Sequence, residues 1–215
     1  MNVSQLEEVR IQRPDRWMIR FAAAAALLLA FPALAQVAQR PAIAVGDSWQ
    51  FVVYYTVLSR VPNRTWVITS IGAERVEATE NGQPLLLTRE LNVVDAPQVR
   101  ESNSRALSFP LEVGKRWSYK SEWLFKSKGS RGTLAVDVAV AGYETVEVPA
   151  GRFEAFRLQA TGELGGDSPS NTFFAGQTTT TYWYAPAARA IVKSVHHNPY
   201  QGTTTVELVA FKAAP

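Results

Sequence analysis

Residues 116–125 read Arg-Trp-Ser-Tyr-Lys-Ser-Glu-Trp-Leu-Phe. The aromatic residues Trp117, Tyr119, Trp123 and Phe125 all fall on odd-numbered positions. Successive side chains of a β-strand point to opposite faces of its sheet. The period of two therefore predicts a half-buried strand, with these aromatic residues on its inner face and polar residues such as Lys120 on its outer face.

The same alternation continues on both sides of this strand. Residues 47–58 and 133–140 repeat it with aromatic and β-branched side chains. Short segments rich in Gly, Pro or Asn separate further candidate strands at 65–71, 74–79, 84–93, 143–148, 153–163, 172–184, 189–197 and 203–211. Short turns join antiparallel neighbours. The chain is therefore predicted to be all-β, an antiparallel meander that forms a curved sheet, a half-barrel or a sandwich.

The alternation indicates a single all-β domain over residues 40–213. Two segments inside it lack the pattern. Residues 95–105 predict a loop or one helical turn, and residues 164–171 predict a mobile loop. No segment shows the periodicity of an amphipathic helix.

An internal repeat is visible in the sequence. Residues 45–51 and 113–119 share the order Val-Gly-x-x-Trp-x-aromatic, and residues 72–77 match residues 142–147 more loosely. An internal duplication predicts two similar meanders that together make one sheet system. Chance similarity between β-rich segments is the alternative.

The N-terminal region resembles an export signal. Residues 18–36 begin with Met-Ile-Arg, continue through about ten apolar residues and reach Ala33-Leu34-Ala35. We therefore expect residues 1–35 to be a signal peptide that starts functionally at Met18 and is cleaved after Ala35. The mature protein would be periplasmic or secreted. A membrane anchor or a buried helix is the alternative.

Composition excludes several classes of function. The chain contains no cysteine, so disulfides, thiol chemistry and lipid attachment at a cysteine are impossible. Its 22 basic and 19 acidic side chains nearly balance, and no basic run interleaved with aromatic residues predicts nucleic-acid binding. No segment after the leader is long and apolar enough to predict a transmembrane helix.

Three motifs carry a family resemblance. They are the Val-Gly-x-x-Trp-x-aromatic element, the segment Val-Pro-Ala-Gly-Arg-Phe-Glu-Ala-Phe at 148–156, and Tyr-Trp-Tyr-Ala-Pro at 182–186. Over residues 45–211 the chain resembles the TapB-like group, uncharacterised periplasmic proteins of Proteobacteria. The resemblance implies a curved antiparallel sheet, similar by fold analogy to the half-barrel of the lipoprotein carriers LolA and LolB. It implies no activity.

The sequence offers few catalytic candidates. His196 and His197 are adjacent, so a strand would point them to opposite faces, and we expect a solvent-facing pair; a metal ligand or base is the alternative. Residues 46–48 read Gly-Asp-Ser like the nucleophile block of one hydrolase family, but the Asp-x-x-His pair of that family is missing. Glu122, Glu144, Glu147 and Glu154 are expected on the outer face. We predict no catalytic residue, metal or cofactor.

The aromatic residues are the best candidates for a binding site. Those that would line a ligand cavity or form the core are Trp49, Tyr55, Trp117, Tyr119, Trp123 and Phe125. An exposed aromatic platform for glycans is a third possibility. The preferred hypothesis is a non-enzymatic envelope protein that binds or scaffolds an apolar, lipid-like molecule or an envelope protein. The alternatives are an accessory protein of a secretion or assembly system without a ligand cavity, and a hydrolase with a carboxylate site. The sequence does not predict an oligomeric state.

Overall fold

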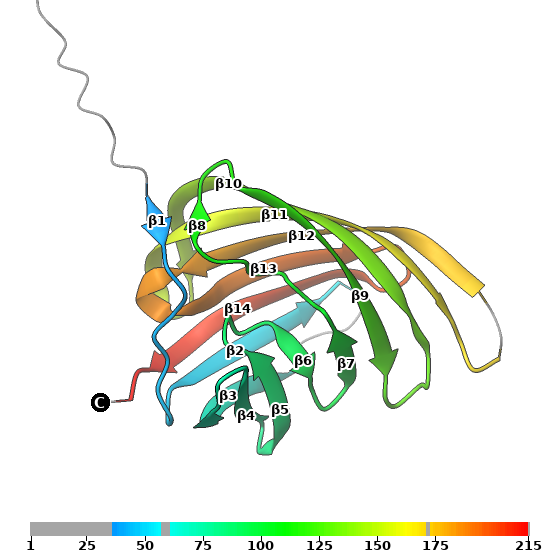
Figure 1. Ribbon diagram of the computed structural model, residues 1–215, viewed down its shortest axis with the longest axis horizontal. Helices are drawn as coiled ribbons and strands as arrows, with labels where there is room; N and C mark the ends of the chain where they lie inside the picture. Colours follow the sequence, from blue (N-terminus) through cyan, green and yellow to red (C-terminus); the bar gives the residue numbers. More distant parts are fainter. Residues whose placement is uncertain (1–35, 57–60, 171–172, 215) are drawn as a thin grey trace, which may run out of the picture. The chain divides into compact units, whose positions relative to one another are not determined.

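The computed structural model describes residues 36–56, 61–170 and 173–214 (Figure 1). The expected signal peptide, Met18 and the expected cleavage site after Ala35 lie outside the described residues. All the elements described belong to one compact unit, Ala35–Pro215.

Antiparallel strands make up most of the described chain, and its one helix is the three-residue η1, which confirms the all-β prediction. The elements are β1 (Val37–Ala38), β2 (Ser48–Tyr55), β3 (Val61–Ile71), β4 (Arg75–Glu80), β5 (Gln83–Thr88), β6 (Val93–Asp95), β7 (Val99–Ser102), β8 (Leu111–Glu112), β9 (Arg116–Phe125), β10 (Arg131–Val148), β11 (Gly151–Asp167), β12 (Phe173–Ala185), the 3₁₀ helix η1 (Pro186–Ala188), β13 (Ala190–Asn198) and β14 (Gly202–Lys212).

The main sheet curves until it closes into a barrel. The strand order is β10-β11-β12-β13-β14-β2-β3-β4-β5-β6-β7-β9, with β9 pairing back onto β10. In Figure 1 the strands β9–β14 sweep across the molecule, and β3 with the short strands β4–β7 completes the ring below them. A curved antiparallel sheet was expected, with a half-barrel and a sandwich left open. Here the curvature continues to full closure, which leaves this sheet without a free edge.

Closure uses a segment that the sequence predicted wrongly. Residues 95–105 were expected to form a loop or a helical turn, but they contain β7, which pairs with β9 from Val99↔Phe125 to Ser102↔Glu122. The expected strand at 84–93 is interrupted at Leu91, whose φ is +66°. The expected loop at 164–171 is strand as far as Asp167. The strands β6 and β7 have only three and four residues, which are too few to show a period of two in the sequence.

The predicted alternation of β9 is confirmed. Arg116, Ser118, Lys120 and Glu122 are exposed, while the residues between them are buried or half-buried. The core forms two clusters. One gathers side chains from β2–β5, η1, β13, β14 and one end of β10–β12 around Trp49. The other lies farther along β10–β12 around Phe156 and Tyr184.

Candidate ligand-binding cavity

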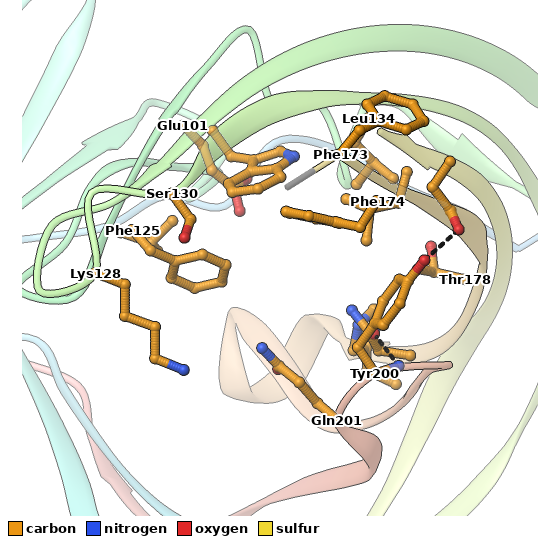
Figure 2. A pocket seen from close by; sticks show the side chains of 16 residues that line it. Glu101, Phe125, Lys128, Ser130, Leu134, Phe173, Phe174, Thr178, Tyr200 and Gln201 are labelled. Carbon is orange, nitrogen blue, oxygen red and sulfur yellow. Dashed lines mark hydrogen bonds between the residues drawn. The ribbon is translucent and has the colours of Figure 1, made fainter. Parts of the chain in front are cut away.

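The candidate site lies at one end of the barrel, where three hairpins end. The pair Arg131↔Asp167 puts the end of β9–β10 beside the end of β11–β12. The Tyr200 hydroxyl donates to the Ala175 carbonyl oxygen, which holds the β13–β14 turn against β12. A cavity of about 650 Å³ opens between these hairpins (Figure 2). This volume is within the range of small-molecule sites.

The walls of the cavity are mainly aromatic and aliphatic. Trp123 and Phe125 come from β9, Leu134 from β10, Leu164 from β11 and Phe174 from β12. The Trp123 ring lies 5.3 Å from the Phe125 ring and 5.8 Å from the Phe174 ring, between ring centroids. Tilted contacts at such distances are favourable for aromatic pairs. The rings therefore form one continuous apolar wall.

Glycines make room for Trp123. Gly132 is its cross-strand partner, and Gly166 is in turn the partner of Gly132. A Cβ atom on Gly132 would lie 2.6 Å from Cζ2 of Trp123, and one on Gly166 would lie 2.7 Å from it. The indole therefore packs directly on the backbone of β10 and β11 at these glycines, and Trp123 is only 7% exposed. Its Nε1–H has no hydrogen-bond partner among the described residues.

Polar groups lie among the apolar ones. The His196 ring Nδ1 is 2.8 Å from the Thr180 hydroxyl, and burial lowers the pKa of His196, with the neighbouring His197 adding to the effect. Burial raises the pKa of Glu101 despite an opposing hydrogen bond from Ser104. Both shifts favour the uncharged form, because desolvation disfavours a charge.

A second cavity of about 340 Å³ adjoins the first, and Val99 and Glu101 line both. Trp49, Trp66 and Tyr182 are among its walls. Burial raises the pKa of Tyr182 to about 12, so its hydroxyl remains protonated at neutral pH. Glu101 is thus part of the wall of both cavities.

The six aromatic residues predicted as cavity or core residues lie in different environments in the structure. Trp123 and Phe125 line the large cavity. Trp49 is core, lines the smaller cavity, and donates from Nε1 to the Ala188 carbonyl oxygen at 2.8 Å. Trp117 and Tyr119 pack against the second core cluster. Tyr55 is half-buried at the end of β2 and lines neither cavity.

The expectation for the histidines was half right. They point to opposite faces, as adjacent strand residues must. His197 is exposed, whereas His196 faces the large cavity rather than solvent. The pairing Thr180↔His196 explains this, because the threonine is itself an inward residue of β12.

The Gly-Asp-Ser sequence has a structural part to play. Asp47 is buried; its Oδ2 accepts from the Ala44 N–H at 2.9 Å and from Arg189 at 3.2 Å, and its Oδ1 accepts from the Ala214 N–H at 2.7 Å. These bonds join the turn before β2 to the end of β14. Asp47 therefore stabilises the contact between the segment before β2 and the segment after β14.

The four glutamates considered as acid–base candidates do not meet. Glu122 and Glu147 are exposed. Glu144 binds Arg157 and accepts from Trp183 Nε1, and Glu154 accepts from Thr145. Across residues 36–56, 61–170 and 173–214 no group of three His, Asp or Glu side chains could hold a metal ion.

Sequence reasoning missed several cavity residues. Glu101 lies in the segment expected to be a loop, and Lys128 and Tyr200 lie in turns. Phe174 lies on an expected strand, but its neighbours alternate too weakly to show its face. Only the three-dimensional meeting of the hairpin ends brings these residues together.

The comparisons with known proteins concern the fold. No protein-family model and no curated protein matches the chain. A Bacteroides fragilis protein inferred to be exported, with a YmcC-like fold, is 15% identical with a TM-score of 0.53, over 81% of this chain and 99% of that one. A Parabacteroides distasonis protein inferred to be a lipoprotein is 13% identical with a TM-score of 0.53, over the same shares.

The hypothetical lipoprotein YmcC of Escherichia coli is 15% identical with a TM-score of 0.41, over 79% of this chain and 85% of that one. At such identities the two higher-scoring likenesses show the fold alone. In the described part of the chain, no helix has the length and apolar character needed to cross a membrane.

Proposed function

We propose that this chain is an exported envelope protein that binds an apolar, lipid-like molecule in the large cavity and performs no catalysis. The observation that carries the proposal is the aromatic and aliphatic wall around about 650 Å³ of space. Ligand sites are typically concave and mainly apolar, with a few polar groups that orient the ligand. Here Thr178, His196 and Glu101 are such groups.

Export has separate support. The leader at residues 1–35 has the organisation of a signal peptide. The similar Bacteroides and Parabacteroides structures are described as an exported protein and a lipoprotein. The resemblance to the TapB-like group points to the same compartment, the bacterial periplasm.

An interaction protein of the envelope is the second candidate, and exposed aromatic residues favour it. Phe173 is 70% exposed and Tyr200 is 55% exposed. Both line the cavity mouth. They would serve a partner protein as well as a ligand, so the content of the cavity decides between the two functions.

Native mass spectrometry of protein purified from its own envelope tests the proposal. We expect a retained small molecule that dissociates on activation. Trp123→Ala should reduce its occupancy, because the wall loses its largest ring. Trp117→Ala is the matched control, since Trp117 packs in the second core cluster and is absent from the cavity wall. A chain that carries no small molecule but retains a second protein would favour the interaction function.

A further inference from the structure

The charges around the large cavity indicate which end of a ligand it recognises. Its lining contains three titratable side chains of interest: Glu101, His196 and Lys128. Burial favours the uncharged forms of Glu101 and His196. Lys128 lies in the turn between β9 and β10 and is exposed. Of these three side chains only Lys128 is exposed, so its ammonium is the charge that lies at the open side of the cavity.

The place of Lys128 sets the orientation of a ligand. Figure 2 shows its side chain extending into the open part of the cavity, facing Gln201 from the β13–β14 turn. Among the described residues no ion pair includes Lys128. By contrast, Lys126 two residues earlier is paired with Asp95 at 2.6 Å. The ammonium of Lys128 is thus available to a ligand at the mouth.

The apolar wall is more buried than this cation, since Trp123 is buried and Leu134 and Phe174 are half-buried, whereas Lys128 is exposed. Trp123, Leu134 and Phe174 would contact an alkyl chain, while a headgroup left at the mouth would stay hydrated beside Lys128 and Gln201. An ion placed at the mouth avoids the desolvation cost that it would incur inside. A charged headgroup and an apolar chain are therefore accommodated at once.

We propose that the cavity selects a single-chain amphiphile with an anionic headgroup, its alkyl chain against Trp123 and Phe174 and its headgroup beside Lys128. The proposal rests on the proposed function, because it requires a lipid-like ligand in this cavity. It adds the class of headgroup and the direction in which the ligand lies.

Three probes with the same chain and different headgroups test the proposal. Dodecanoate, dodecan-1-ol and dodecyltrimethylammonium are titrated into ligand-free protein by calorimetry, below their micelle-forming concentrations. We expect dodecanoate to bind about three- to fivefold more tightly than the alcohol, as for one partly exposed ion pair, and the cation to bind most weakly. The preference should shrink as salt is added.

Lys128→Met keeps most of the aliphatic length and removes the charge, so it should abolish the preference for dodecanoate. Lys120→Met is the matched control, because Lys120 is exposed on the outer face of β9, and it should leave the preference unchanged. Equal affinity for all three probes, or a preference that survives Lys128→Met, overturns the headgroup assignment and leaves the lipid-like ligand intact. If no probe binds, the assignment is wrong, and native mass spectrometry then decides separately whether the cavity holds any ligand.

Discussion

Trp123 is buried at the edge of a hollow because two glycines let its ring lie directly on the backbone of β10 and β11. A side chain at Gly132 or Gly166 would meet the indole at 2.6 to 2.7 Å. The absence of two side chains thus orients the largest ring of the cavity. This coupling between small and large residues is what a closely packed interior requires.

Gly166→Ala should therefore destabilise the protein by about 1–3 kcal/mol, the usual range for overpacking. Its Cβ would lie 2.5 Å from the Arg131 carbonyl oxygen as well as against Trp123. Gly165→Ala is the neighbouring control, because its Cβ meets nothing within 4 Å. We expect that variant to be neutral or slightly stabilising, by less than about 1 kcal/mol. Urea denaturation of both variants measures the difference, and equal effects would contradict the packing described.

At the scale of elements, the short strands β5–β7 close the barrel with few pairs. β5 and β6 share the partners Leu86↔Asp95 and Leu87↔Val93, and β6 meets β7 only at Asp95↔Arg100. So few backbone bonds make this the weakest part of the ring. Ion pairs between side chains stabilise this part of the ring. Asp95 Oδ1 lies 2.6 Å from Lys126 Nζ, and Asp95 Oδ2 lies 3.3 Å from Arg100 Nη2.

Asp95 should make the stability of this region depend on pH. Burial by itself raises the pKa of Asp95, but hydrogen bonds and charge from Lys126 and Arg100 outweigh it, so the pKa lies below its ordinary value of 3.8. A group whose pKa is lower in the folded state stabilises the fold above its unfolded pKa. That contribution is present above about pH 4 and disappears as the pH falls through the lowered folded value.

We therefore expect Asp95→Asn to reduce the free energy of unfolding at pH 7 by about 0.5–1 kcal/mol, as for a partly exposed ion pair. The difference from wild type should vanish once the pH falls below the folded pKa. Denaturant unfolding across that range gives the measurement, with Lys126→Met expected to follow the same course and Lys120→Met expected to be neutral. A difference that persists unchanged in acid would show that charge is not its cause.

The repeated Val-Gly turns are also alike in structure. Gly46 and Gly114 adopt φ values of +92° and +95°, which favour glycine. The Gly46 N–H donates to Ile68 and the Gly114 N–H donates to Val140, each at 2.9 Å.

The two copies differ at the second pair of matched segments, residues 72–77 and 142–147. The chain reverses at Gly72 between β3 and β4, whereas β10 runs on through a bulge between Val140 and Gly142. The similarity seen in the structure therefore covers the two Val-Gly turns, and the duplication as a whole stays a prediction.

At the scale of the whole protein, the expected removal of the leader defines which part of the chain belongs to the folded protein. The prediction is a mature chain that begins at Gln36, because Ala33-Leu34-Ala35 has the small residues that a signal peptidase requires. Intact mass measurement of the exported protein checks this start directly. Deleting residues 1–17 should leave export intact, since they contain Glu7, Glu8 and Asp15, which are unusual at the start of a signal peptide, whereas Met-Ile-Arg at 18–20 is an ordinary start. Loss of export in that deletion, or a mass that still includes residues 18–35, would contradict the assignment.

The sequence by itself determined most of the longer strands, the inner face of β9 and the antiparallel pairing of chain neighbours, because a period of two is a local property that neighbouring residues record. It also predicted that Trp123 and Phe125 would face inward. The tertiary structure alone decided that β7 and β9 meet, that the sheet closes, and that Glu101, Lys128, Phe174 and His196 surround one cavity. Pairing between distant strands depends on backbone hydrogen bonds, which carry no side-chain signature, and a cavity depends on where hairpin ends meet in space.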